Sequence, residues 1–116
     1  MKHNWIFEDI GYDLNMSFEN IQEIEGNRQT LSTWLGEDVR DYRIMLDDVI
    51  KVLNGDSEYE ELWCDLFTAD VYKDYTEIHS NFEDNMPPPC KVPTPLLREI
   101  IEVWLEEREK YYANKK

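Results

Sequence analysis

The sequence has 116 residues, of which 41% are hydrophobic and 33% are charged. A chain of this length fits one domain, residues 1–116, whose hydrophobic core needs neither disulfides nor a structural metal. Acidic residues number 26 and basic residues 12, so the formal net charge is −14. Such a field repels nucleic-acid phosphates and anionic membranes and attracts cationic partners, although charge alone fits a role in solubility equally well.

The acidic excess belongs to the first three quarters of the chain. Residues 1–90 contain 21 acids and six bases, whereas residues 91–116 contain five acids and six bases. The two cysteines, Cys64 and Cys90, do not have the spacing of a zinc site or a disulfide framework. No run is apolar enough for a signal peptide or for the ~20 residues of a membrane span, so we expect a cytoplasmic protein.

The first 35 residues give weak structural signals. A short strand is expected at residues 4–7, and a helical segment at residues 17–25 that Ser17 caps and Gly26 ends. Residues 31–35 fit either helix or strand. Because a sheet of two strands is marginally stable, we expect one more strand from this region.

A helix is predicted at residues 37–53. Asn54 and Gly55 supply its stop, because both residue types tolerate the left-handed backbone conformation. The helical spacing gives it an apolar face formed by Tyr42, Met45, Leu46, Val49, Ile50 and Leu53.

A β-hairpin is predicted at residues 61–82. An aromatic-rich run at residues 62–72 is followed by a short turn at Lys73-Asp74. The next run alternates, with Ile78 and Phe82 on one face and Glu77 and His79 on the other.

Prolines separate this hairpin from the last element. Residues 86–93 include three consecutive prolines, which favour an extended polyproline connection. A helix is predicted at residues 95–112, with Thr94 as its N-cap and Pro95 at its first position. Its apolar stripe consists of Leu97, Ile100, Ile101, Trp104, Leu105, Tyr111 and Tyr112. The predicted fold class is therefore α+β, with a small antiparallel sheet (hairpin 61–82) packed against helices that include 37–53 and 95–112.

Residues that carry out catalysis are scarce. The two histidines, His3 and His79, have no neighbouring nucleophile motif, and a phosphate-binding loop is not evident among four glycines. Asp70, Asp74 and Glu77 resemble a magnesium site, but a nuclease also needs bases to hold phosphates, and only Lys73 is near. We expect a protein that is not an enzyme and binds neither cofactor nor metal.

Protein binding fits the composition better. Carboxylates attract Arg and Lys side chains, and Tyr and Trp supply the desolvated contacts that carry most affinity. Helix 37–53 and hairpin 61–82 are the two candidate surfaces, because both place acids beside aromatics. An ordinary polar sheet face remains an equal interpretation of the hairpin. The candidate partner-binding residues are Glu37, Asp38, Asp41, Asp65, Asp70, Tyr72, Asp74, Tyr75 and Glu77.

A resemblance points in the same direction. The segment from Val92 to Leu105, following a polar hairpin, resembles the ending of bacterial immunity proteins of contact-dependent growth inhibition and related polymorphic toxin systems. The resemblance implies a cytoplasmic antidote that binds a basic toxin domain 1:1, often a nuclease, and occludes its active or substrate-binding surface. It carries over no catalytic motif and no binding residue.

Three alternatives stay open. An acidic nucleic-acid mimic would space its acids along an extended surface and inhibit several DNA-binding proteins. A small regulatory subunit would join a larger complex through an apolar helix face. An enzyme with a carboxylate metal site would bind divalent ions tightly.

Overall fold

The computed structural model describes residues 3–11, 13–82, 84 and 87–114. The elements in chain order are β1 (Ile6–Asp9), β2 (Leu14–Ser17), β3 (Glu25–Gly26), α1 (Arg28–Thr33), a π-helical turn (Trp34–Asp38), α2 (Tyr42–Leu53), β4 (Tyr59–Trp63), β5 (Phe67–Tyr72), β6 (Tyr75–Ser80), β7 (Cys90–Pro93) and α3 (Thr94–Asn114). The predicted α+β class is confirmed.

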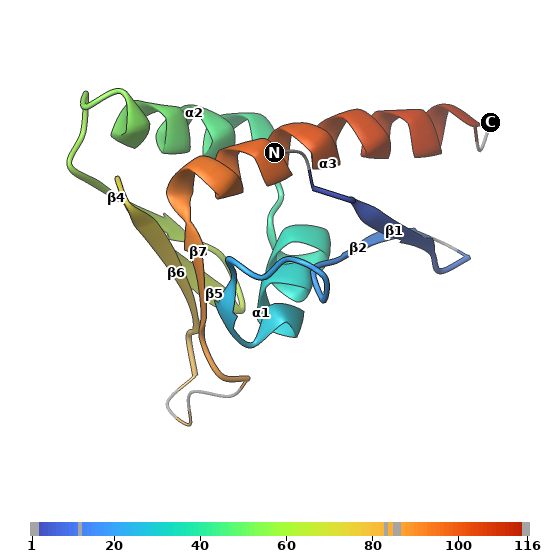
Figure 1. The fold of residues 1–116 in the computed structure, drawn as a ribbon, viewed down its shortest axis with the longest axis horizontal. Coiled ribbons are helices and arrows are strands. Elements are labelled where there is room, and N and C mark those ends of the chain that lie inside the picture. Colours follow the sequence, from blue (N-terminus) through green and yellow to red (C-terminus); the bar gives the residue numbers. More distant parts are fainter. Residues whose placement is uncertain (1–2, 12, 83, 85–86, 115–116) are drawn as a thin grey trace.

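The strands form two antiparallel sheets. β1 and β2 pair as a separate hairpin, while five strands form a sheet in the order β3-β7-β6-β5-β4. Helix α2 contacts β4 and β5, and α1 and α3 contact β6 and β7. Figure 1 shows α2 and α3 along one end of the molecule, with α1 beneath them and the β1–β2 hairpin beside the last turns of α3.

The core lies between the five-stranded sheet and the helices. Alternate strand residues Ala69, Val71 and Ile78 are buried, because side chains alternate between the two faces of a strand. Trp34 and Trp104 are the largest fully buried side chains. Burial of one such side chain stabilises the fold by roughly 1.5–3 kcal/mol, so truncation of either tryptophan would weaken the whole domain.

Helix α2 begins later than predicted. Asp41 caps it, with Oδ1 accepting the backbone N–H of Ile44 at 3.1 Å, while Glu37 and Asp38 belong to the preceding π-helical turn. Gly55, with φ of 83°, supplies the left-handed residue after the helix, whereas Asn54 stays right-handed. The buried face includes the expected Tyr42, Met45 and Val49, together with Val52.

The predicted hairpin is a three-stranded meander. A turn at residues 64–66 divides its first run into β4 and β5, and the predicted turn at Lys73-Asp74 joins β5 to β6. The alternation in β6 is confirmed, since Ile78 is buried while Glu77 and His79 are partly exposed. Phe82 lies beyond the end of β6 and is 56% exposed, so it does not share the buried face.

The prediction for residues 17–25 is wrong. Ser17 ends β2, and residues 18–24 follow as turns that bury Phe18, Ile21 and Ile24. The expected extra strand exists as β3, in which Gly26 pairs with Cys90 of β7. Residues 31–35, which fit either helix or strand, are helical. A strand does form near residues 4–7, but it starts two residues later than expected, as β1 (Ile6–Asp9).

The start of α3 also differs from the prediction. Thr94 is fully buried, and its hydroxyl donates to the carbonyl oxygen of Tyr72 instead of capping the helix. Because the hydroxyl proton of Thr94 is used in this hydrogen bond, Oγ1 of Thr94 acts as the acceptor for the hydroxyl of Thr76 at 2.9 Å. The end of the proline-rich segment forms β7, while residue 86 lies outside the described residues.

Candidate protein-binding face

One face of the five-stranded sheet points away from the helices. Because side chains alternate along each strand, the residues between the buried core positions lie on this opposite face. We call it the outer sheet face. Its charged and aromatic residues are Glu25, Tyr59, Glu61, Trp63, Asp70, Tyr72, Tyr75, Glu77, His79 and Lys91.

A row of charged residues crosses the outer sheet face at one level. Glu61 lies opposite Asp70, and Asp70 lies opposite Glu77. The row continues to Lys91 and ends at Glu25. Like charges in directly opposed positions destabilise a sheet, by roughly 0.2–1 kcal/mol for each pair. The Glu61–Asp70 and Asp70–Glu77 pairs therefore oppose folding, whereas Lys91 lies opposite both Glu77 and Glu25 and compensates the repulsion in part.

Asp70 stands at the centre of a hydrogen-bond network on this face. One carboxylate oxygen accepts the phenol O–H of Tyr59 at 2.6 Å, and the other lies 2.8 Å from Nε2 of His79. The hydrogen bond to Asp70 and partial desolvation raise the pKa of Tyr59 well above its ordinary value, so the phenol stays protonated. The network holds Tyr59 and His79 in fixed orientations.

A ladder of tyrosines lies beside the acidic row. The ring centroids of Tyr59 and Tyr72 are 5.0 Å apart, and those of Tyr72 and Tyr75 are 5.1 Å apart. Lys91 Nζ lies 4.1 Å from the centroid of the Tyr75 ring. Stacked rings lose little conformational entropy on binding, because they are already ordered. The ladder therefore suits a binding surface in which aromatic contacts supply the affinity.

An apolar anchor lies at the β4 edge of the face. Trp63 is 72% exposed, and Ile44 on α2 is 60% exposed. Both line a groove of about 330 Å³ between α2 and β4, together with the acidic side chains of Asp48 and Glu61. Exposed large apolar side chains beside an indentation mark interaction sites in soluble proteins.

The structure brings together four of the residues predicted from sequence. Asp70, Tyr72, Tyr75 and Glu77 share the outer sheet face, and Asp74 is exposed in the turn between β5 and β6. The hairpin acids and aromatics thus form one continuous surface.

The remaining predicted residues lie elsewhere and have other contacts. Asp65, in the turn between β4 and β5, pairs with Arg40 at 3.0 Å, and Asp41 caps α2. Glu37 is exposed on the π-helical turn. Asp38 is only 5% exposed, because its carboxylate accepts the backbone N–H groups of Leu66 and Phe67. Its role is structural, and we leave it out of the binding surface.

Six residues of the face were not predicted as binding residues: Glu25, His79 and Lys91 on three different strands, and Tyr59, Glu61 and Trp63 on β4. The three on β4 alternate with Glu60 and Leu62, which is the period of a half-buried strand. This alternation predicts that Tyr59, Glu61 and Trp63 share one exposed strand face. The prediction of a single run at residues 62–72 instead joined Leu62 and Trp63 to the residues of β5.

The acids of the outer sheet face are suited to pairing with Arg and Lys side chains. Both histidines of the protein lie within hydrogen-bonding distance of a carboxylate. His79 contacts Asp70, and Nε2 of His3 lies 2.8 Å from Oε2 of Glu23. Within residues 3–11, 13–82, 84 and 87–114, no group of three His, Cys, Asp or Glu side chains is placed to hold a metal ion.

Fold and site together define an α+β domain with an uncovered, acidic and aromatic sheet face. No protein-family model, curated protein or solved structure matches this chain. In the part of the chain that the structure describes, no helix has the length and apolar character needed to cross a membrane.

Proposed function

We propose that this protein is an immunity-type inhibitor that binds a basic toxin domain 1:1 through the outer sheet face. The toxin is most simply a nuclease, whose active or substrate-binding surface the face occludes. The observation that carries the proposal is the row Glu61–Asp70–Glu77, three acids opposed on adjacent strands of a sheet face left uncovered.

The spacing of the row suits a phosphate-binding surface. Adjacent strands lie about 4.8 Å apart, so opposed carboxylates form a closely spaced anionic array. Arg and Lys side chains that hold a nucleic-acid backbone would meet these carboxylates in place of phosphates. The tyrosine ladder and Trp63 lie beside the array and supply apolar contact area at the same surface. Inhibition by this mode requires no chemistry by the inhibitor.

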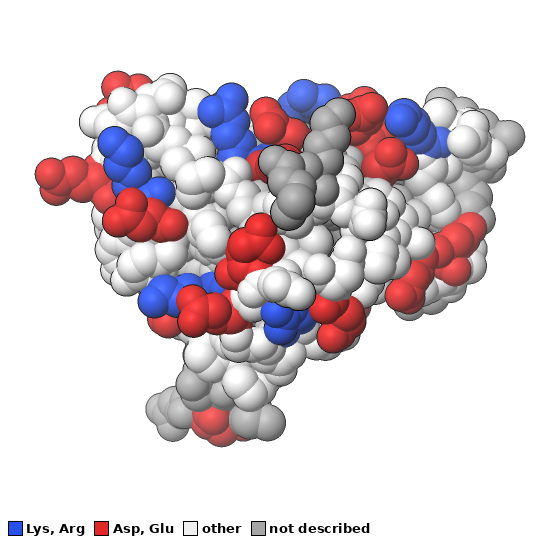
Figure 2. Space-filling view, viewed as in Figure 1, with Lys and Arg blue, Asp and Glu red and all other residues white. Residues whose placement is uncertain are grey.

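Two features weigh against the alternative functions. A nucleic-acid mimic needs a long run of acids, but here the row spans one sheet and is interrupted by Lys91. A regulatory subunit that docks through the apolar stripe of α3 needs that stripe to be free. Leu97, Ile100 and Trp104 instead lie in the core. Charge elsewhere is mixed, since Figure 2 shows bases and acids interspersed along α3 on the face that it displays.

The test compares capture of partners by three forms of the protein in lysate of the native host. They are the wild type, the triple variant Glu61→Gln/Asp74→Asn/Glu77→Gln, and the control Glu19→Gln/Glu102→Gln/Glu106→Gln. Both variants change the net charge by the same amount, but the control acids lie off the outer sheet face. Asp70 is left intact because it orders Tyr59 and His79.

If the proposal is correct, the wild type and the control capture one basic protein at 1:1 stoichiometry, and high salt releases it. The Glu61→Gln/Asp74→Asn/Glu77→Gln variant fails to capture it. Purified partner is then assayed for toxicity and nuclease activity with and without the inhibitor. Equal capture by both variants would exclude the outer sheet face. A captured partner that lacks any toxic activity would exclude the immunity function.

A further inference from the structure

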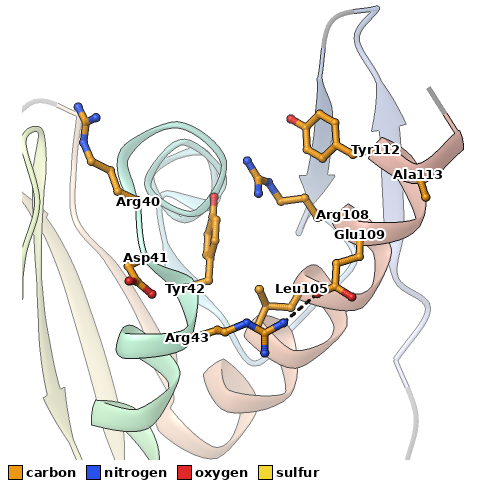
Figure 3. A pocket seen from close by; sticks show the side chains of 9 residues that line it. All are labelled: Arg40, Asp41, Tyr42, Arg43, Leu105, Arg108, Glu109, Tyr112 and Ala113. Carbon is orange, nitrogen blue, oxygen red and sulfur yellow. Dashed lines mark hydrogen bonds and ion pairs between the residues drawn. The ribbon is translucent and has the colours of Figure 1, made fainter. Parts of the chain in front are cut away.

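A cleft lies apart from the outer sheet face, between the start of α2 and the last turns of α3. Its volume is about 610 Å³. Figure 3 shows side chains from both helices directed into it. The lining residues are Arg40, Asp41, Tyr42, Arg43, Leu105, Arg108, Glu109, Tyr112 and Ala113.

The cleft is basic although the protein is strongly acidic. Three of the five arginines in the sequence line it. The two acids of the lining are already engaged, because Asp41 caps α2 and Glu109 pairs with Arg43 at 2.9 Å. The lining therefore holds three cations and two acids. Two further acids contact it from outside, because Asp65 pairs with Arg40 and the carboxylate of Asp13 accepts the hydroxyl of Tyr112.

Arg108 is the central cation of the cleft. Its guanidinium carbon lies 5.2 Å from the ring centroid of Tyr42 and 5.0 Å from that of Tyr112, and Figure 3 shows it between the two rings. Arg40 and Arg43 each form an ion pair, whereas Arg108 forms none among the described residues. Stacking against rings leaves the in-plane N–H groups of a guanidinium free to donate.

We propose that this cleft binds a small ligand that carries an oxyanion, a phosphate or carboxylate group, with Arg108 as its principal donor. The planar guanidinium presents two parallel N–H groups that match either oxyanion. Tyr42 and Tyr112 flank the guanidinium and restrict its movement, so less side-chain entropy is lost on binding. Arg40 lines the same cleft, although its guanidinium is paired with Asp65 at 3.0 Å.

The size and surroundings of the cleft restrict the ligand. A volume of about 610 Å³ lies within the range of small-molecule sites. Leu105, Ala113 and the exposed ring of Tyr112 offer contact to an apolar or aromatic body attached to the oxyanion. A nucleic acid or another polyanion is disfavoured, because the net charge of −14 repels every phosphate beyond the first.

This inference is independent of the proposed function. The cleft shares no lining residue with the outer sheet face, and it has only Arg40 and Asp41 in common with the groove beside Trp63. Arg108 and Tyr112 line the cleft alone, so either site can fail its test without affecting the other.

The experiment follows the arginine side-chain Nε–H resonances of the full-length protein during titration with phenyl phosphate and, separately, with benzoate. The two probes share an aromatic body and differ only in the oxyanion. We expect a saturable shift of the Arg108 resonance with at least one probe, and the stronger probe identifies the preferred oxyanion. Arg98, which pairs with Glu102 on the same helix, is the internal control and should not respond.

Two variants complete the test. Arg108→Gln should weaken binding by about tenfold or more, because a charge-assisted pair is lost, whereas Arg98→Gln should bind like the wild type. Both are checked by circular dichroism for an unchanged fold. Shifts at Arg108 that fail to saturate, or equal binding by Arg108→Gln and the wild type, would overturn the proposal.

Discussion

The carboxylate of Asp38 accepts the backbone N–H of Phe67 at 2.9 Å across 29 residues of sequence. The same carboxylate accepts the N–H of Leu66. It therefore fixes the turn that divides β4 from β5 to the π-helical turn that precedes α2. Through this contact the helical layer positions β4, the strand that carries Tyr59, Glu61 and Trp63 to the outer sheet face.

Replacement of Asp38 by Ala is expected to destabilise the fold by about 3 kcal/mol, because two N–H groups lose a charged acceptor. Urea unfolding measures the loss. Glu37→Ala is the matched control, since Glu37 is adjacent and exposed, and its effect should stay within about 0.5 kcal/mol. Similar small losses in both variants would show that the Asp38 contact does not hold the turn.

The acidic row predicts a stability gain from removal of one charge. Glu61 is opposed on the strand ladder only by Asp70, so Glu61→Gln should raise the free energy of unfolding by roughly 0.2–1 kcal/mol. Glu77 is opposed by Asp70 on one side and by Lys91 on the other, so Glu77→Gln should change stability little. Thermal unfolding at low and high salt checks both, and salt should shrink the Glu61→Gln gain. A loss of stability in Glu61→Gln would contradict the repulsion argument.

Trp63 is predicted to act in binding and not in folding. It is 72% exposed, so Trp63→Ala should change the free energy of unfolding by no more than about 0.5 kcal/mol. In the capture assay, the same variant should lose affinity by about tenfold, as for an aromatic side chain that is buried by the partner. Ile10→Ala, at the 44% exposed Ile10 next to the β1–β2 turn, is the control for loss of an exposed apolar side chain. Unchanged capture by Trp63→Ala would remove the β4 edge from the proposed interface.

Local periodicity predicted the long elements correctly, because their signal lies within a few residues. Helix α3 and the β5–β6 turn at Lys73-Asp74 fall where spacing and turn residues place them, and α2 ends at the predicted Leu53 although it begins later than predicted, at Tyr42. Residues 17–25 were misassigned because no local rule reveals that Glu25 and Gly26 pair with β7, more than 60 residues later in the chain. The cap at Thr94 failed for a similar reason, since its hydroxyl is taken by Tyr72 of a distant strand.

The candidate site was predictable only in part. Alternation in β6 correctly separates Glu77 from Ile78, but the row from Glu61 to Glu25 requires the registers of four strand pairs, which depend on tertiary packing. Asp38 shows that the sequence can also suggest a surface residue where the side chain is in fact buried. An acid beside exposed acids resembles a surface residue, and only its contact with Leu66 and Phe67 shows that it is buried.

The buried thiol of Cys90 should make the folded protein less stable at alkaline pH. Its thiol is 1% exposed, and burial raises its pKa from 9.0 to about 11. In the unfolded chain the thiol ionises near pH 9, so alkali favours unfolding between pH 9 and pH 11. The stabilising contribution is complete below pH 9 and falls by up to about 3 kcal/mol as pH rises through this window.

The Cys90→Ala variant isolates this effect. Several tyrosines, including Tyr42 and Tyr59, also have raised pKa values, but they contribute equally to both proteins. The difference in the free energy of unfolding between wild type and Cys90→Ala should therefore shrink between pH 8 and pH 10.5, measured by urea unfolding under reducing conditions. A difference that stays constant with pH would mean that the folded protein ionises Cys90 as readily as the unfolded chain.

Gly26 and Gly55 provide a matched test of the close approach between β3 and β7. Both have positive φ, 87° and 83°, so an alanine at either position costs about 1 kcal/mol in backbone strain. A Cβ at Gly55 meets open space, whereas a Cβ at Gly26 would lie 2.4 Å from the carbonyl oxygen of Pro89. That oxygen also accepts the N–H of Asn27 at 3.1 Å, so it cannot move without loss of a hydrogen bond.

We expect Gly55→Ala to lower the free energy of unfolding by about 1 kcal/mol and Gly26→Ala to lower it by about 2 kcal/mol more, as measured by urea unfolding. Equal losses in the two variants would mean that β3 lies farther from Pro89 than the structure places it.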